Sequence, residues 1–288
     1  MFLHSQRSKP RGIQYGGLLH RKAFPSLIAK LRNGGEPARR YAAGFLTHVV
    51  LDRRSHPYIN YFAGWWDREQ PETKRYRHMH PFLERLIDME LLDSREGRRP
   101  GELRFEELVS CGEQMPEPLF RAYLDALRGS ASSAERDGEL PARLHNAYRD
   151  AVGYYRYTSE VDDAYMREAR RRESAGEISD RWLSLVYPPH LPYTVDVMNT
   201  ARREWCHPCD KARKQRCSFS EIWETALPEA AELLQILFST SSGAELETAI
   251  GPENLNDGLY GSLPCRRRFM SPLPLRELYD TIRRSYDP

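Results

Sequence analysis

The stretch GFLTHVVLDRRSHPY, residues 44–58, decides how this 288-residue sequence is interpreted. Side chains that commonly bind metal recur in it at intervals of four residues, and the segment HPFLERLID, residues 80–88, repeats the interval. Residues four apart lie on one face of an α-helix, about one turn from each other. The sequence therefore predicts two helices that each present metal-binding side chains along one face: His48, Asp52 and His56 on the first, His80 and Glu84 on the second.

The first of these helices is predicted to begin at Glu36-Pro37, with proline in its first turn. Most of its faces carry apolar residues, a pattern typical of a buried helix. A buried histidine or aspartate costs several kcal/mol unless it is paired or bound to metal, so His48 and Asp52 become candidate ligands. Pro57 predicts that the helix ends at or before His56.

Helical spacing of apolar residues covers most of the remaining chain, and we find no internal repeat and no convincing alternating strand pattern. The predicted fold class is all-α, a multi-helix bundle. We expect a single helical domain, with the metal-site helices in 1–92, a helical middle in 102–172, and C-terminal helices with an irregular tail in 181–288. After an irregular segment at 1–17, helices are predicted at 18–31, 36–56, 73–92 (with a bend or late start at Pro81), 103–109, 118–127, 140–172, 196–205, 219–238 and 274–286.

Imidazole and carboxylate groups together suit zinc and other divalent first-row metals. His48 and His56 are about 12 Å apart along a helix, too far for one ion. An Asp52 that bridges two metals resolves this, and metal pairs about 3.5–4 Å apart are a common device for hydrolysing phosphate esters. His20 is a further candidate ligand. The alternative interpretation is that these residues are surface polar groups and helix caps.

Three other features leave alternatives open. Asp88 continues the face of His80 and Glu84, where it either orients a ligating histidine or pairs with Arg85 or Arg53. The aromatic segment 58–66 either packs or forms a hydrophobic lip, and packing is favoured. Cys206-His207-Pro208-Cys209 with Cys217 has the spacing of a partial zinc knuckle, but incidental thiols are the favoured interpretation.

The bulk composition fits a folded, soluble protein, with 40% hydrophobic and 29% charged residues. A formal net charge of +2 gives no global electrostatic case for nucleic acid. No apolar run approaches the roughly 18 residues that span a bilayer. The N-terminal residues lack the apolar core of a signal peptide, so a cytoplasmic protein is expected.

The order of these residues resembles the zinc-dependent phospholipase C family, and in particular a short bacterial branch of it. The resemblance is carried by His20, the run GFLTHVVLD at 44–52, SHPY at 55–58, and the pattern His80-x-x-x-Glu84-x-x-x-Asp88. It implies the helical bundle that this family shares with single-strand-specific zinc nucleases. His20, His48 and Asp52 would hold one zinc ion. Asp52, His56, His80 and Glu84 would hold a second, and Glu84 would extend to a third.

The family's further amino-terminal ligands have no counterpart in this sequence, so two zinc ions are expected rather than three. The expected activity is hydrolysis of a phosphoric ester, a phospholipid or small phosphodiester, by metal-bound hydroxide, with Asp52 and Glu84 as catalytic residues. One alternative is a non-catalytic helical zinc-binding protein that lost activity with those ligands. Another is a nuclease or nucleotide phosphodiesterase that uses the same ligands.

Overall fold

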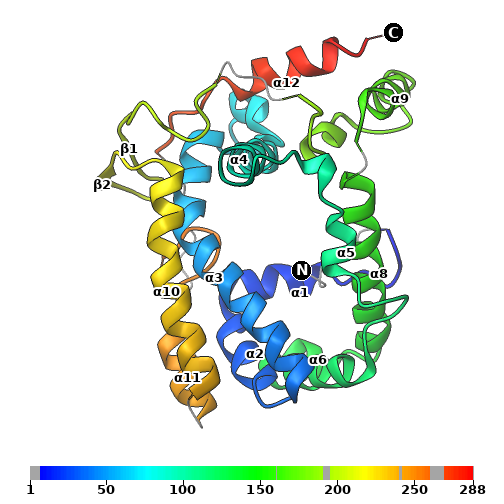
Figure 1. Ribbon diagram of the computed structural model, residues 1–288, viewed down its shortest axis with the longest axis vertical. Helices are drawn as coiled ribbons and strands as arrows, with labels where there is room; N and C mark the ends of the chain where they lie inside the picture. The colour runs from blue at the N-terminus through cyan, green and yellow to red at the C-terminus, as the bar shows by residue number, and fades with distance from the viewer. Residues whose placement is uncertain (1–6, 160, 191–194, 240–241, 260–268, 288) are drawn as a thin grey trace. The chain divides into compact units, whose positions relative to one another are not determined.

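The computed structural model describes residues 7–159, 161–190, 195–239, 242–259 and 269–287 (Figure 1). These residues are mostly helical, and one two-stranded sheet is the exception, so the all-α class expected from the sequence is confirmed. The chain forms two compact units, Met1–His56, Val109–Gly153 and Glu221–Pro264 in the first and Pro57–Leu108, Tyr154–Ser220 and Cys265–Pro288 in the second. No helix in the described ranges is long and apolar enough to cross a lipid bilayer.

The first unit is built around a continuous apolar core. Leu27, Leu46 and Leu127 are fully buried in it and come from three different helices. Helices α3, α8 and α10 also contribute residues to the second unit. The elements with most of their length in the first unit are α1 (Ile13–Leu18), the π-helical turn η1 (Leu19–Ala23), α2 (Phe24–Leu31), α3 (Glu36–Ala63), α6 (Glu117–Ser130), α7 (Ser132–Glu135), α8 (Leu140–Ser159), α10 (Phe219–Ser239) and α11 (Gly243–Ile250).

The second unit has an aromatic core. The Tyr58 ring lies 4.6 Å from that of Phe62 and 5.4 Å from that of Trp205, so most of segment 58–66 packs inward, although Trp65 is 40% exposed. The elements here are η2 (Pro71–Tyr76), α4 (Met79–Glu96), η3 (Pro100–Glu102), α5 (Phe105–Val109, ending in the first unit), α9 (Asp163–Ser174), η4 (Asp180–Leu185), the antiparallel strands β1 (Trp205–His207) and β2 (Asp210–Gln215), and α12 (Leu275–Arg284).

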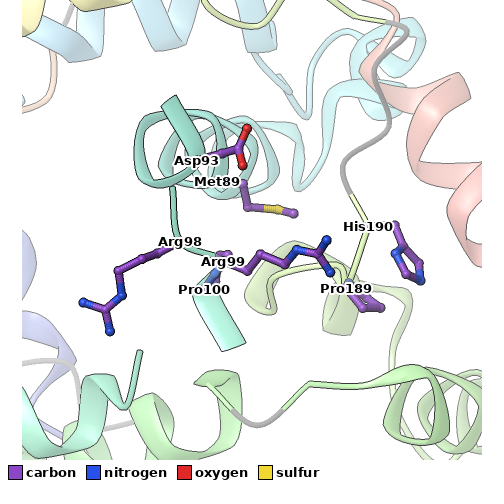
Figure 2. A pocket seen from close by; sticks show the side chains of 7 residues that line it. All are labelled: Met89, Asp93, Arg98, Arg99, Pro100, Pro189 and His190. Atoms are coloured by element: carbon purple, nitrogen blue, oxygen red, sulfur yellow. The ribbon is translucent and has the colours of Figure 1, made fainter. Parts of the chain in front are cut away.

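An open recess of about 210 Å³ lies on the second unit (Figure 2). Met89, Arg99 and His190 are among the side chains that line it, and none of the six predicted metal ligands is. The predicted late start of the helix around Pro81 is correct, because α4 begins at Met79 and follows a separate 3-10 turn.

The predicted end of the ligand-bearing helix at His56 is wrong. Helix α3 continues to Ala63 with Pro57 inside it. An interior proline costs about 3 kcal/mol. The residues after it, Tyr58, Ile59 and Phe62, are at most 2% exposed. Since each buried side chain of this size gains about 1.5–3 kcal/mol, continuing the helix outweighs the cost of the proline.

Other boundaries also differ from the prediction. Helix α1 begins at Ile13, inside the segment expected to be irregular, and residues 1–6 of that segment lie outside the described ranges. The helix predicted at 196–205 is absent. There the Asp196 carboxylate accepts hydrogen bonds from the backbone N–H groups of Thr200 and Ala201, and Asn199 has a left-handed φ of 53°. Both features close turns and oppose a helix.

The predicted helix 140–172 is likewise two helices. Asp162 N-caps α9 by accepting a hydrogen bond from the backbone N–H of Tyr165, 2.7 Å away. An N-cap residue has extended backbone, so it separates α9 from α8.

Candidate metal centre

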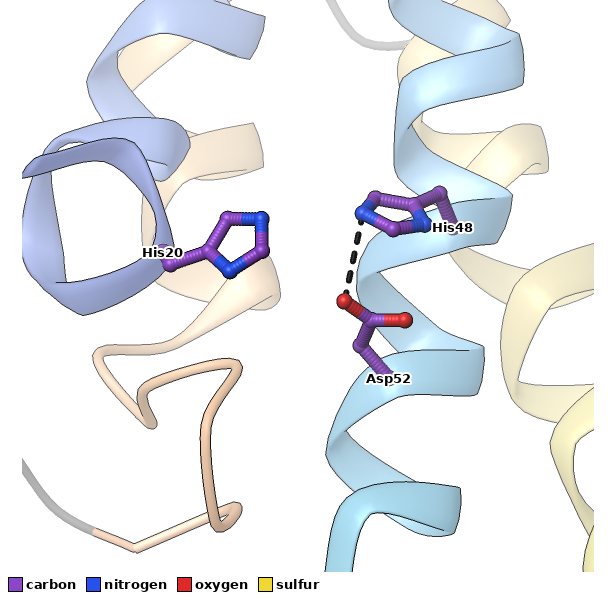
Figure 3. Close-up of side chains that lie close together, drawn as sticks. All are labelled: His20, His48 and Asp52. Atoms are coloured by element: carbon purple, nitrogen blue, oxygen red, sulfur yellow. Dashed lines mark ion pairs between the residues drawn. The ribbon is translucent and has the colours of Figure 1, made fainter. Parts of the chain in front are cut away.

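Three of the predicted ligands come together in the first unit. One ligand atom each from His20, His48 and Asp52 lies within 4.8 Å of the others. His48 Nε2 is 3.2 Å from Asp52 Oδ2, and the rings of His20 and His48 have centroids 6.1 Å apart. Figure 3 shows the His20 side chain directed from its own helical turn toward His48 and Asp52 on α3. The structure thus brings together two side chains four residues apart on α3 and a histidine from a separate helical turn.

The burial expected for these residues is only partly present. The side chain of Asp52 is 13% exposed, but that of His48 is 38% exposed. Gly44 and Thr47 are exposed, so α3 is not apolar on nearly all faces. The free-energy cost of burial therefore supports a metal at Asp52 more strongly than at His48.

The donor set fits zinc. Ligand atoms about 2.0–2.2 Å from a tetrahedral zinc ion lie roughly 3.3 Å from each other. The His48–Asp52 separation of 3.2 Å already has this value. One ring nitrogen of His20 lies within 4.8 Å of both of these ligand atoms. Imidazole and carboxylate are ligand types that suit zinc and other divalent first-row metals.

His20 reaches the site from a π-helical turn, a local geometry that sequence periodicity does not reveal. In a π-helix the carbonyl of one residue faces the N–H five residues later, and for His20 that residue is Pro25, which carries no hydrogen. The turn therefore ends there, and the His20 carbonyl instead accepts a hydrogen bond from the Leu255 N–H at 2.8 Å. Single π-helical turns occur frequently at functional sites.

His56 is buried in the first unit, and its tautomer is fixed by a contact with Leu255. Its Nδ1 contacts the carbonyl oxygen of Leu255. A carbonyl can only accept, so Nδ1 carries the proton and Nε2 presents its lone pair. This arrangement, in which one ring nitrogen donates to a carbonyl, is typical of histidines that bind metal through the other nitrogen.

The segment around Leu255, residues 251–259, was missed by sequence analysis, which treated it as part of a weakly patterned tail. We call it the Leu255 loop. It follows α11, and Arg53 donates hydrogen bonds to carbonyls at its start, as described below. The signals that could have located it are the turn-forming residues Asn254, Asp257 and Gly258.

His80 and Glu84 form a second pair, in the second unit. His80 Nε2 lies 3.0 Å from Glu84 Oε1, and His80 Nδ1 lies 3.1 Å from Asn60 Oδ1. Both ring nitrogens therefore face oxygen atoms, although a neutral imidazole has only one N–H to donate. His80 is thus held between the Asn60 amide and the Glu84 carboxylate, both at hydrogen-bond distance. Asn60, 2% exposed, is a positioning residue that the sequence did not identify.

Asp88 pairs with Arg85 rather than with Arg53. Its Oδ2 accepts hydrogen bonds from Arg85 Nη1 at 3.2 Å and from the Tyr187 hydroxyl at 3.0 Å. Desolvation raises the pKa of Asp88 above the ordinary range, against the opposing effects of Arg85 and Tyr187. Arg85 also donates to the Tyr154 hydroxyl, so Asp88 belongs to an arginine–tyrosine network.

The cysteine pattern does not form a thiolate site. Cys209 is disulfide-bonded, which removes it as a zinc ligand, and the Cys217 thiol donates to Gln215 Oε1 at 3.2 Å. Burial raises the pKa of the Cys206 thiol, which opposes thiolate formation. These findings argue against the partial zinc knuckle.

Comparison of the chain with models of known protein families, with curated proteins and with solved structures found no match. The resemblance to zinc-dependent phospholipase C consequently stays a prediction from the motif.

Proposed function

We propose that this protein is a zinc-dependent phosphoric-ester hydrolase of the phospholipase C type, with the helical bundle of that family. The observation that carries the proposal is the convergence of His20, His48 and Asp52 to within 4.8 Å. A second observation supports it: His80 and Glu84, which the same sequence pattern singles out, lie 3.0 Å apart on α4. The hydrolytic activity is proposed because the order and spacing of these residues in the sequence resemble those of zinc-dependent phospholipase C.

His20, His48 and Asp52 would bind the metal ion and hold it in position. His20 and His48 would hold zinc as neutral imidazoles, and Asp52 would hold it as a carboxylate. Zinc, when bound, supplies Lewis acidity and lowers the pKa of a bound water toward about 7. His56 would serve as a ligand through Nε2, because its Nδ1 proton is held by the Leu255 carbonyl.

Glu84 and His80 supply the groups that hold or move a proton. Their side chains are 37% and 31% exposed, so solvent reaches both. His80 Nε2 and Glu84 Oε1 are 3.0 Å apart, a distance at which a proton could pass between them. Asn60 keeps the imidazole ring directed at Glu84, because its Oδ1 accepts the Nδ1 proton. With a second ion bound, the same two atoms would be its ligands.

The test is metal analysis of the purified protein combined with turnover of a generic chromogenic phosphodiester. We expect two zinc ions per chain and zinc-dependent hydrolysis. His48→Ala and Asp52→Asn are each expected to reduce bound zinc and abolish turnover. The matched control is His190→Ala, because that side chain is 72% exposed and belongs to the recess of the second unit.

The outcomes separate the proposal from its alternative. Zinc bound at the site without turnover of any phosphodiester would favour a non-catalytic zinc-binding protein. Protein that folds equally well without zinc, and whose zinc affinity is the same in the His48→Ala and His190→Ala variants, would exclude the site. Hydrolysis of a phosphodiester in lipid but not in nucleic acid would favour a phospholipid substrate and exclude the nuclease alternative.

A further inference from the structure

Arg53 lies between Asp52 and His56 on α3 and is directed at the polypeptide after α11. Each of its three guanidinium nitrogens donates to a different backbone carbonyl. The side chain is 9% exposed and also lies 5.2 Å from the centre of the Phe24 ring. The acceptors are the carbonyls of Ile250 (2.6 Å from Nη1), Gly251 (3.1 Å from Nη2) and Glu253 (3.2 Å from Nε).

These three carbonyls lie where α11 ends and the Leu255 loop begins. The last carbonyls of a helix have no partner within the helix, and cations stabilise them. Gly251, with φ of +75°, directs the chain out of the helix. An arginine with three fixed donor directions holds such a turn in one conformation, which the single ammonium group of lysine cannot do.

The rest of the loop is held by its own side chains. Asn254 Nδ2 donates to Asp257 Oδ1 at 2.7 Å, and the backbone N–H of Leu259 donates to the same oxygen at 3.0 Å. Asn254 and Asp257 are at most 5% exposed. The loop therefore behaves as one rigid piece, whose position on α3 depends on the Arg53 contacts.

Leu255 contacts two candidate ligands directly, so the position of the loop affects both. Its N–H donates to the His20 carbonyl at 2.8 Å, and its carbonyl accepts from His56 Nδ1. One residue thus fixes the backbone of the first histidine and the tautomer of the second. Both contacts require Leu255 to remain where Arg53 anchors the loop.

We propose that Arg53 is a positioning residue that orients His20 and His56 for metal through the Leu255 loop. The metal part of this inference rests on the proposed function. Arg53 binds no metal itself, since its donors are directed at carbonyls. Loss of such an indirect partner typically lowers metal affinity 10- to 100-fold.

The experiment compares Arg53→Ala, Arg53→Lys and Arg54→Ala. The third is the matched control, because Arg54 is the next arginine on α3 and pairs with Glu229 at the surface. Zinc affinity is measured by competition with a chromogenic chelator. The tautomer of His56 is measured in metal-free protein by nitrogen-15 NMR, with the resonance assigned through a His56→Gln variant.

We expect zinc affinity to fall 10- to 100-fold in Arg53→Ala, less in Arg53→Lys, and less than about threefold in Arg54→Ala. The His56 imidazole is expected in the Nδ1–H form in the wild type and as a mixture of both tautomers in Arg53→Ala. If Arg53→Ala does not fold, Arg53→Lys is judged by the same two measurements.

An Arg53 variant that matches Arg54→Ala in both readouts would overturn the proposal. If the wild type binds no zinc, the proposed function fails, and the positioning role of Arg53 is then judged from the His56 tautomer alone. A mixture of tautomers in the Arg53 variant supports that role, and an unchanged Nδ1–H form rejects it.

Discussion

Gly258 is the residue through which the Leu255 loop approaches α3 most closely, and its substitution gives a quantitative test of that contact. Its φ is +67°, and a Cβ at this position would lie 2.7 Å from the carbonyl oxygen of Arg53. A real Cβ essentially never comes so near a backbone oxygen, so alanine here must displace the loop.

The cost of Gly258→Ala has two parts. Left-handed backbone costs alanine about 1 kcal/mol. A loop that shifts to relieve the contact loses the hydrogen bond from Gly258 N–H to the Asn254 carbonyl, or the bond from Leu259 N–H to Asp257, at about 1 kcal/mol each. We therefore expect the free energy of unfolding to fall by about 2–3 kcal/mol.

Gly97→Ala measures the cost of a left-handed backbone by itself. Gly97 has a similar φ, +60°, and no heavy atom of the described residues would lie within 4 Å of its Cβ. Its substitution should cost only about 1 kcal/mol. Both variants are compared by urea unfolding followed by far-ultraviolet circular dichroism. Equal destabilisation by the two alanines would refute the close approach of the loop to α3.

Three further predictions concern individual contacts. Asp137 is partly buried, which would raise its pKa, but hydrogen bonds from Tyr15 and other donors lower the pKa overall. The Asp137 carboxylate should therefore stabilise the protein at neutral pH, and this stabilisation should disappear as pH falls through the lowered pKa. In urea unfolding, Asp137→Asn should cost about 2 kcal/mol at pH 7 and little at pH 2. A cost that does not change with pH would contradict this. Asn60→Leu removes the acceptor of His80 and should weaken zinc binding about 10-fold in chelator competition; unchanged affinity would show that the ring is oriented otherwise. Tyr58→Phe removes a buried 2.7 Å hydrogen bond to a carbonyl and should cost about 1–2 kcal/mol, followed by tryptophan fluorescence during unfolding; a neutral effect would contradict it.

Periodicity alone located most of the long helices among the described residues. The helix at 219–238 was predicted almost to its ends, because its inward positions recur at helical spacing over several turns. The pairing of His48 with Asp52, and of His80 with Glu84, follows from the same spacing and requires no tertiary information.

Features that depend on tertiary contacts could not be predicted in this way. The hairpin of β1 and β2 has one buried strand and one almost fully exposed strand, so neither shows the alternation by which strands are recognised. The continuation of α3 past Pro57 depends on burial of Tyr58 and Phe62 in the second unit. The Leu255 loop carries turn residues, but the sequence does not show which helix it packs on.

The Leu255 loop approaches two carbonyls that each lie upstream of a proline in a helix. Pro25 and Pro57 each occupy a helical position whose missing N–H leaves an upstream carbonyl without its helical donor: that of His20 in the π-helical turn, and that of Arg53 in α3. Buried carbonyls need a new contact, since an unsatisfied one costs free energy comparable to a lost hydrogen bond. The Leu255 N–H donates to the first carbonyl, whereas Gly258 only lies close to the second, because its own N–H donates to the Asn254 carbonyl. Pro25, which the sequence analysis placed inside a predicted helix at 18–31, therefore leaves the His20 carbonyl available to the Leu255 loop, and this contact joins the loop to a candidate ligand.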